Sequence, residues 1–348
     1  MRLIRGVAQH YEWGDTDAIP RLLGQAGDGR PWAEWWLGTH AGGPSHFADD
    51  TTLGSAAGEL PYLLKLLAAA EPLSLQTHPD TATAQAGFAR ERAAGIAIDD
   101  PARIYRDPYA KPELLCALAP FDTLCGFRPP ADTEALLHAL GAHELASVLH
   151  HDGLEATVSA LYRGTIASAP LVQACQGHPS PQAQLVNRLE ASYPGDASVA
   201  VTLFLHRVRL QPGEALYLGP GNLHAYLDGV GVEVMGASDN VVRGGLTSKH
   251  VDVDELLRVL SFEPLADPVV RPEMYLPRCW RYATPDAPFE LHRFDIDDML
   301  TYTAHSREVL LCTDGDSGVL RRGAAGYLAP GESVTLAGPS TVFCVVEN

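Results

Sequence analysis

The sequence predicts a mainly β protein in which a helical segment interrupts the β structure and a second all-β segment closes the chain. Short apolar runs separated by Gly, Pro and Asp dominate residues 1–127, whereas Leu, Ala and Val recur at helical spacing in residues 128–206. Strand signals return from about residue 207. Because 348 residues exceed what one hydrophobic core commonly serves, two or three domains are expected.

The first 127 residues contain one helix signal. It covers Thr81 to Ala94, and Asp80 directly before it is a residue type that caps helix N-termini. The remaining apolar runs are short and bounded by turn residues, which is typical of strands. The longest run, Leu63 to Ala70, is too short to span a bilayer and contains Lys65.

The helical character begins after Arg128-Pro129-Pro130. Helices are expected at Asp132 to Leu149, Gly153 to Tyr162 and Gln182 to Ala191. We therefore predict a helical insert over residues 128–206, flanked by residues 1–127 and 207–263, which together form one β domain.

Strands and turns dominate the rest of the chain. Gln211 to Glu214 and Gly219 to Asn222 have turn composition, and Asp252 to Leu260 has the pattern of a short amphipathic helix. From residue 264 onward only short strands and turns are expected. Residues 264–348 are predicted to form a second β domain.

Two stretches of the chain resemble each other. Residues 212–218 (Pro-Gly-Glu-Ala-Leu-Tyr-Leu) and 330–336 (Pro-Gly-Glu-Ser-Val-Thr-Leu) both precede a Gly-Pro turn. After the first copy the chain presents His224, whereas residues 341–344 after the second copy offer only apolar or weakly polar side chains. Two related β domains, of which only the first holds metal, would explain this similarity. Chance or common turn chemistry is the alternative.

The charge of the chain limits its partners. A formal charge of -18 and a pI near 5.1 argue against binding to nucleic acid or to an anionic membrane surface, since both require a basic footprint. An acidic surface also serves solubility. An anionic substrate must then find a local cationic pocket.

The cysteines and the N-terminus indicate a reducing compartment. The six cysteines show neither a C-x-x-C pair nor the density of a disulfide scaffold, so reduced core thiols are expected. Residues 1–14 contain no apolar run long enough for a signal peptide. We predict a cytoplasmic protein.

Residues 72–80 are the most informative stretch. Alternation along a strand places Ser74, Gln76 and His78 on one face. Further along the chain, Lys111 precedes Glu113 by two residues, and a second imidazole, His224, follows a tight turn.

These residues suggest a metal site with mixed nitrogen and oxygen ligands. Two imidazoles, one carboxylate and one amide oxygen leave a divalent ion with net positive charge and an open position. The residue types favour zinc, although Mn, Fe and Co also suit them. An ordinary polar strand face is the alternative for Gln76 and His78. The predicted ligands are Gln76, His78, Glu113 and His224.

Residues 231–249 concentrate charged side chains among small ones, and their glycines allow a ligand to approach the backbone. A loop of solvated charges and ion pairs is the alternative. The charged residues are Glu233, Asp239, Arg243 and Lys249.

At this point a family resemblance becomes specific. The chain resembles the type I mannose-6-phosphate isomerases from Tyr11-Glu12-Trp13-Gly14 to about residue 263, and the likeness is weak beyond. It departs from the common pattern at Trp35, Gly244 and Ser248, none of which changes the spacing of a predicted ligand. The segments that carry the resemblance, in the same order as in the family, are residues 33–40, 60–65, 73–80, 109–113, 121–128, 224–226 and 238–249.

The resemblance implies a fold and an activity. It implies a cupin-type jelly-roll catalytic domain with a helical insert, a second C-terminal jelly roll lacking metal ligands, and zinc-dependent interconversion of mannose 6-phosphate and fructose 6-phosphate. The expected partner is a small-molecule sugar phosphate, and the expected state is a monomer or weak homo-oligomer.

The resemblance also implies roles for individual residues. The family's zinc ligands, one ion per chain, fall on the four predicted ligands, and its catalytic arginine falls on Arg243. Further catalytic positions and the substrate-binding positions fall around the pocket. They are Glu233, Lys111 and Asp239 for catalysis, and Lys249, Ser74, Tyr226 and Trp13 for substrate binding.

An aldose-ketose isomerisation moves a proton between neighbouring carbons through a cis-enediol or enediolate. Sequence leaves the general base open among Glu233, Asp239, Lys111 and a metal-bound water. Three other functions are compatible with the scaffold: a noncatalytic sugar-binding cupin, a cupin dioxygenase using Fe(II), and an isomerase of an unphosphorylated sugar. A dioxygenase would usually present a more histidine-rich ligand set.

Overall fold

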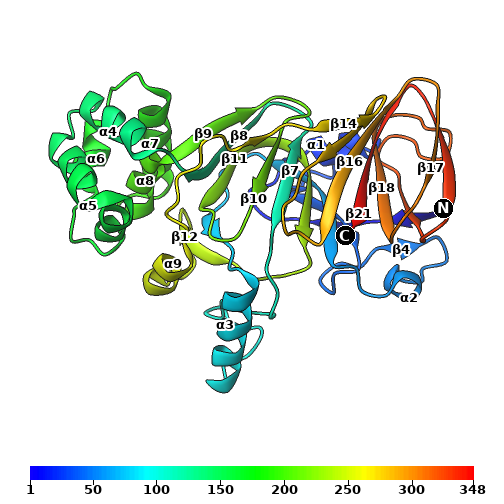
Figure 1. Ribbon diagram of the computed structural model, residues 1–348, viewed down its shortest axis with the longest axis horizontal. Coiled ribbons are helices and arrows are strands. Elements are labelled where there is room, and N and C mark those ends of the chain that lie inside the picture. The colour runs from blue at the N-terminus through cyan, green and yellow to red at the C-terminus, as the bar shows by residue number, and fades with distance from the viewer.

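The computed structural model describes residues 1–348, and most of its strands belong to two large antiparallel sheets (Figure 1). The first sheet has the order β13-β10-β7-β11-β5-β3-β2, with β6, β8, β9 and β12 attached to the end of β11. Its strands are β2 (Val7–Gln9), β3 (Glu34–Gly38), β5 (Tyr62–Ala69), β6 (Leu75–Thr77), β7 (Glu113–Ala117), β8 (Phe121–Phe127), β9 (Leu205–Leu210), β10 (Ala215–Leu218), β11 (His224–Gly236), β12 (Val242–Gly245) and β13 (Val269–Val270).

Strand β11 joins the two layers of this sheet. Its residues 229–236 pair with β5 and residues 231–235 pair with β7, whereas residues 224–228 pair with β8 and His224 also pairs with β6. A register shift between Tyr226 and Asp228 marks a bulge, which bends a strand and lets it change layer. Between the layers lies an apolar core that includes Leu67 and Leu115 from one side and Phe121 from the other.

The second sheet has the order β14-β15-β16-β21-β18-β19-β1-β4, and a separate two-stranded sheet, β17-β20, packs on it through its own core. We expected residues 264–348 alone to form this second domain, but β1 and β4 from the N-terminal region pair at its edge. Strand β1 covers the otherwise open edge of β19. The strands are β1 (Arg2–Arg5), β4 (His46–Phe47), β14 (Glu273–Leu276), β15 (Cys279–Tyr282), β16 (Phe289–Ile296), β17 (Met299–Thr303), β18 (Glu308–Gly315), β19 (Ala325–Leu328), β20 (Ser333–Ala337) and β21 (Ser340–Glu347).

The two large sheets share a core. Leu64 and Val232 of the first sheet belong to the same buried cluster as Phe289, Val309 and Phe343 of the second. Strand β5 is therefore covered on both faces, and all of its residues are buried. This double burial explains why its sequence is an apolar run, interrupted only by Lys65, rather than an alternating one.

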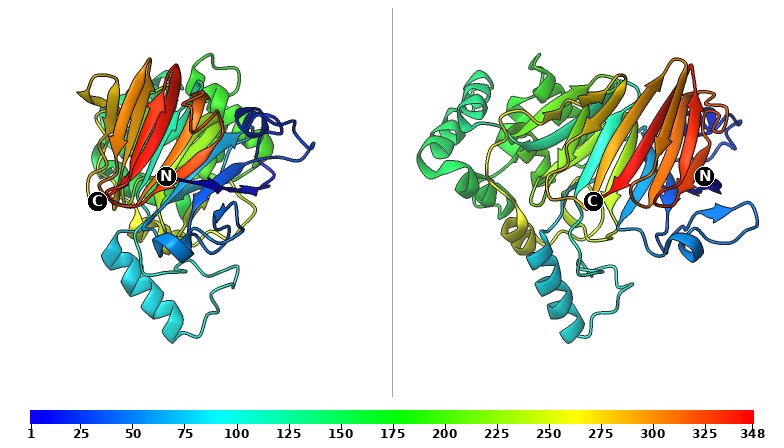
Figure 2. Two further views of the ribbon diagram at one scale, coloured as in Figure 1. Left: turned by 90° about the vertical axis from the view of Figure 1, so that its right-hand side faces the viewer. Right: turned by 45° about the vertical axis from the view of Figure 1, so that its right-hand side comes forward.

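The helices of the insert lie at the end of the molecule opposite the second sheet, and α3 projects from the body (Figures 1 and 2). Helix α3 (Thr81–Ala93) confirms the predicted helix, and the Asp80 carboxylate accepts a hydrogen bond from the Thr83 N–H as a cap. The other helices are α1 (Ala18–Leu22), α2 (Gly54–Ala57), α4 (Pro130–Ala139), α5 (His143–Tyr162), α6 (Ala169–Ala174), α7 (Pro181–Ser192), α8 (Ala197–Val201), the 3₁₀ helix η1 (Thr202–Phe204) and α9 (Val253–Val259).

The single helix predicted from Asp132 to Leu149 is wrong. Helix α4 ends at Ala139, and Gly141 at φ 75° separates it from α5. Helix α5 then continues past Leu149 and is kinked at Gly153, whose φ is 83°. None of the helices is long and apolar enough to cross a bilayer. All six cysteines are free and buried.

The two similar stretches adopt the same turn. Gly213 and Gly331 have φ values of 87° and 81°. In the first turn the Glu214 carboxylate accepts a hydrogen bond from the backbone N–H of residue 211, and in the second the Glu332 carboxylate accepts one from that of residue 329. Turn chemistry therefore accounts for the shared Pro-Gly-Glu portion.

Candidate metal centre and its surroundings

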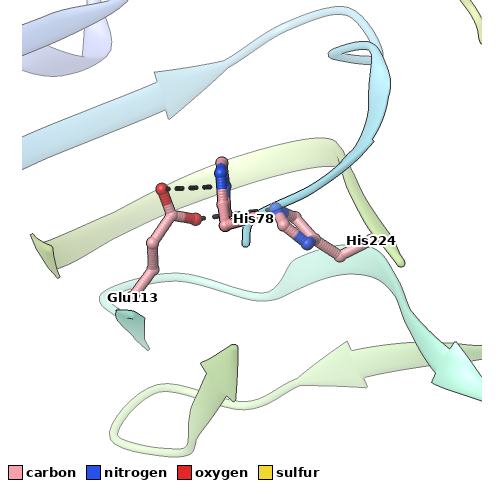
Figure 3. A group of neighbouring side chains, drawn as sticks. All are labelled: His78, Glu113 and His224. Carbon is pink, nitrogen blue, oxygen red and sulfur yellow. Dashed lines mark ion pairs between the residues drawn. The ribbon is translucent and has the colours of Figure 1, made fainter. Parts of the chain in front are cut away.

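Three of the predicted ligands converge inside the first sheet (Figure 3). The Glu113 carboxylate, at the start of β7, lies between the two imidazoles: its Oε1 is 3.4 Å from His78 Nε2 and its Oε2 is 3.5 Å from His224 Nε2. All three side chains are buried, and their potential ligand atoms lie within 4.8 Å of one another. The convergence of His78, Glu113 and His224 is a candidate metal site.

Both imidazoles are oriented by backbone carbonyl groups. His78 Nδ1 lies 2.8 Å from the Asn240 carbonyl oxygen, and His224 Nδ1 lies 3.0 Å from that of Asn222. Because a carbonyl only accepts, each Nδ1 carries the proton and each Nε2 keeps a lone pair. Both Nε2 atoms are buried and make no hydrogen bond, so the donor set fits a divalent metal ion.

Charge also shapes this centre. Burial lowers the pKa of His78 to about 4, and the nearby Glu113 only partly offsets this effect. Burial alone would raise the pKa of Glu113, but the Lys111 ammonium, 3.1 Å away, and the two imidazoles hold it well below its usual range. The site therefore contains a carboxylate anion and a neutral imidazole, which are the forms that bind metal.

Gln76, the fourth predicted ligand, lies next to this group in the strand register. In the strand register it lies opposite His224 of β11 on one side and Arg243 of β12 on the other. Directly opposed residues of antiparallel strands share a face, so these three side chains form one row. The Ser74 hydroxyl lies 3.4 Å from Gln76 Oε1, at the limit of a hydrogen bond.

A second group of buried charged residues lies on the paired strands β3, β5 and β11. Lys65 Nζ contacts Glu34 Oε1 at 3.1 Å and Glu233 Oε2 at 2.9 Å, and the Tyr226 hydroxyl donates to Glu233 Oε1 at 2.9 Å. Burial alone would lower the pKa of Lys65, but the two carboxylates raise it, whereas burial raises the pKa of Glu233. Sequence reasoning missed the roles of Lys65 and Glu34; the lone lysine in an apolar strand was the available signal.

Three cations gather near the end of β12. Burial and the neighbouring Arg106 lower the pKa of Arg243, and burial, Arg243 and Arg106 lower that of Lys249. None of the three has a carboxylate oxygen within 4.0 Å, although the protein as a whole is acidic. Sequence reasoning missed Arg106, because only tertiary packing brings its loop to β12.

Asp239 and Trp13 are the remaining predicted site residues. The Asp239 side chain is 47% exposed, and its Oδ1 is 3.2 Å from His40 Nε2, which lowers the pKa of Asp239. Trp13 is partly buried against the apolar cluster that contains Tyr226, and its ring stacks on exposed Tyr11 with centroids 5.8 Å apart. The contacts of Trp13 are thus apolar.

A β fold that brings two imidazoles and a carboxylate together from separate segments of the chain defines it as a cupin-type protein with a candidate metal centre. Residues 1–130 match the model of the family described as phosphomannose isomerase type I, catalytic domain. The chain is 35% identical to mannose-6-phosphate isomerase of Escherichia coli (strain K12), covering 97% of this chain and 94% of that protein. The chain belongs to the type I phosphomannose isomerase family of enzymes.

Other relatives and solved structures agree. Mannose-6-phosphate isomerase 1 of Arabidopsis thaliana is 30% identical, covering 85% of this chain and 79% of that protein. The crystal structure of a phosphomannose isomerase variant from Salmonella typhimurium matches with a TM-score of 0.91 at 30% identity, covering 100% of this chain and 99% of that one. A mannose 6-phosphate isomerase bound with zinc and yttrium matches with a TM-score of 0.86 at 31% identity and the same coverage.

Proposed function

We propose that this enzyme interconverts mannose 6-phosphate and fructose 6-phosphate through a cis-enediol(ate), with one zinc ion per chain. The observation that carries the proposal is the pair of buried, unpartnered imidazole Nε2 atoms facing Glu113 beside a group of unpaired cations. The first feature suits a metal ion and the second suits an anionic substrate. The names of the relatives point to the same reaction.

Gln76, His78, Glu113 and His224 would hold the zinc ion. A zinc ion bound there supplies Lewis-acid polarisation of the carbonyl and hydroxyl oxygens at C1 and C2 of the open-chain sugar. The two backbone carbonyls that orient the imidazoles keep both Nε2 lone pairs directed at the site. The Lys111 ammonium, 3.1 Å from Glu113, stabilises the carboxylate as an anion.

The cations would bind the charged parts of the substrate. Arg243 lies directly opposite Gln76 in the strand register, so we assign it to the negative charge that develops on oxygen in the enediolate. We assign Lys249 and Arg106 to the phosphate group, because neither is neutralised by a carboxylate. In a chain with a formal charge of -18, such a local field is what attracts a dianion.

The reaction removes a proton from C2 of the aldose and returns it to C1, while a hydroxyl proton moves from O2 to O1. Glu233 is poorly placed to touch substrate, because Lys65 and Tyr226 occupy its two oxygens. Asp239 is half exposed and close to Lys111 and Arg106. We therefore favour Asp239 as the group that accepts the proton.

His40 would orient this base. Its Nδ1 accepts the Gly42 backbone N–H, so Nε2 carries the proton and donates to Asp239. In this proposal Glu233 holds Lys65 and Tyr226 in place rather than moving protons at the sugar carbons.

A coupled assay tests the function. It compares mannose 6-phosphate with free mannose for the enzyme as purified, after chelator dialysis, and after zinc is restored. We expect isomerisation of mannose 6-phosphate that is lost with the metal and regained with zinc, and a far lower kcat/KM for free mannose. No turnover of mannose 6-phosphate with zinc restored would refute the proposal, and equal turnover of free mannose would favour the unphosphorylated-sugar isomerase.

A further inference from the structure

Two loops that lie outside the metal ligands are bonded tightly to each other. Residues 106–109 precede β7, and residues 238–240 precede β12. The Asp107 carboxylate accepts hydrogen bonds from the Ser238 hydroxyl at 2.8 Å, from the Asp239 N–H at 2.8 Å and from Asn240 Nδ2 at 3.2 Å. We call Asp107, Ser238 and Asn240 the loop clamp.

Asn240 is the centre of the loop clamp. It is fully buried, and its Oδ1 accepts the Arg106 N–H at 2.8 Å and the Asp107 N–H at 3.3 Å. Its Nδ2 donates to the carbonyl oxygens of Asp107 at 2.8 Å and Tyr109 at 2.9 Å. Both polar atoms of the Asn240 side chain are thus hydrogen-bonded to the 106–109 loop. These bonds fix the position of the backbone at residue 240.

The same residue contacts a predicted metal ligand through its backbone. The Asn240 carbonyl oxygen accepts the proton of His78 Nδ1 at 2.8 Å. If this carbonyl moved, the His78 ring could rotate or exchange its proton between the two nitrogens, and the Nε2 lone pair would no longer be held toward Glu113.

We infer that the loop clamp is a positioning device that fixes the tautomer and orientation of His78 for the metal and ties this ligand to Arg106 of the cationic group. The inference rests on the proposed function for the identity of the metal as zinc. Asn240 joins the two parts, because its carbonyl holds the ring of His78 and its side chain holds the backbone of Arg106. Neither Asp107 nor Asn240 is a predicted ligand or a predicted catalytic residue.

Nuclear magnetic resonance tests the tautomer without metal or turnover. The full chain is labelled with ¹⁵N-histidine, stripped of metal, and the His78 signal is assigned by its absence in His78→Gln. We expect the Nδ1–H tautomer at His78. In Asn240→Asp an acceptor replaces the amide that faced two carbonyls, so we expect His78 to become a mixture of tautomers. His224 is an internal control, since Asn222 rather than the loop clamp holds its ring.

Zinc affinity is the second measurement, made by competition with a chromophoric chelator. We expect Asn240→Asp to weaken zinc binding by roughly 10- to 100-fold, which is the usual effect of losing a group that orients a metal ligand. Ser238→Ala removes a single hydroxyl and should cause a smaller loss, which keeps the test valid if Asn240→Asp folds poorly. Asp122→Asn is the matched control, because it breaks a partly buried ion pair with Arg207 (2.6 Å) outside the loop clamp.

Two results would overturn the inference. One is an Nε2–H tautomer at His78 in the unmodified chain. The other is unchanged His78 signals and zinc affinity in both folded loop-clamp variants. Because neither readout uses activity, a chain that shows the expected tautomer and zinc losses but does not isomerise mannose 6-phosphate would refute the proposed function and leave the loop clamp standing.

Discussion

Lys65 and Glu233 are cross-strand partners on β5 and β11, and their side chains form a buried ion pair with Nζ and Oε2 2.9 Å apart. Glu34 contacts the same ammonium at 3.1 Å, so two buried anions share one buried cation on the first sheet. Removing one member of such a group leaves uncompensated charge in a medium that solvates it poorly.

We therefore predict that Lys65→Met destabilises the protein strongly, by about 3–5 kcal/mol, which is the usual effect of breaking a buried ion pair. Urea denaturation measures this free energy of unfolding. The control is Arg5→Met, which breaks an exposed ion pair with Asp50 and should change stability far less. Equal effects of the two variants would contradict the importance of the buried charges.

Loss of a ligand should abolish stoichiometric zinc binding. Glu113→Gln keeps the shape of the side chain but removes the anion between the two imidazoles, and His224→Gln removes one imidazole. We expect both variants to contain much less than one zinc per chain after chelator dialysis, measured by atomic emission. The control is His138→Gln, an exposed histidine of the helical insert. Full zinc retention in both ligand variants would show that the ligands are elsewhere.

Arg243 and Lys249 should affect different kinetic constants. Arg243→Ala is expected to keep zinc and to lower kcat by roughly 10²- to 10³-fold, the range for a group that stabilises charge in the transition state. Lys249→Ala is expected to act mainly on KM for mannose 6-phosphate, since we assign it to phosphate. The control is Arg271→Ala on the surface. An unaltered kcat in Arg243→Ala would reassign this arginine.

The two glycines of β12, Gly244 and Gly245, should differ in how well they tolerate substitution by alanine. Gly245 has φ 130°, and a Cβ there would lie 2.1 Å from Ser198 Oγ, the hydroxyl that accepts the Leu246 N–H at 3.1 Å. We expect Gly245→Ala to destabilise the chain by about 1–3 kcal/mol and to lower kcat, because β12 carries Arg243. Gly244→Ala is the matched comparison: its Cβ would meet the Tyr162 hydroxyl at 3.2 Å and Leu223 Cδ1 at 3.1 Å, so only side-chain ends must shift. Thermal unfolding should rank Gly245→Ala as the less stable of the two.

His292 of the second sheet should make a pH-dependent contribution to stability. Burial lowers the pKa of His292 below its usual value of 6.5, although Glu290, 3.2 Å from its Nε2, partly opposes this shift. His292 therefore takes up a proton at a higher pH in the unfolded chain than in the folded chain. Its contribution to stability is complete above about pH 6.5 and is lost as the pH falls toward the lower pKa that His292 has in the folded chain. We expect His292→Gln to have a flatter dependence of unfolding free energy between pH 7.5 and pH 5.5. Parallel curves would contradict this assignment.

Local patterns allowed several parts of the fold to be predicted. Asp80 and Asp252 are residue types that cap helices, and each accepts a backbone N–H at the start of α3 and α9. The break after Ala139 was missed, because Leu and Ala continue at helical spacing across it and only Gly141 marks the interruption. The motif order indicated the family, and three of the predicted ligands do converge.

The sequence by itself determined the types of ligand, the helix caps and the succession of β, helical and β segments, because these depend on residues close together in the chain. Tertiary structure alone decided that β1 and β4 complete the second sheet, that Lys65 lies buried between two carboxylates, and that Arg106 lies near enough to Arg243 to lower its pKa. The physical reason is that strand pairing joins residues far apart in sequence. Local propensity does not specify which distant partner a strand edge or a buried charge will find.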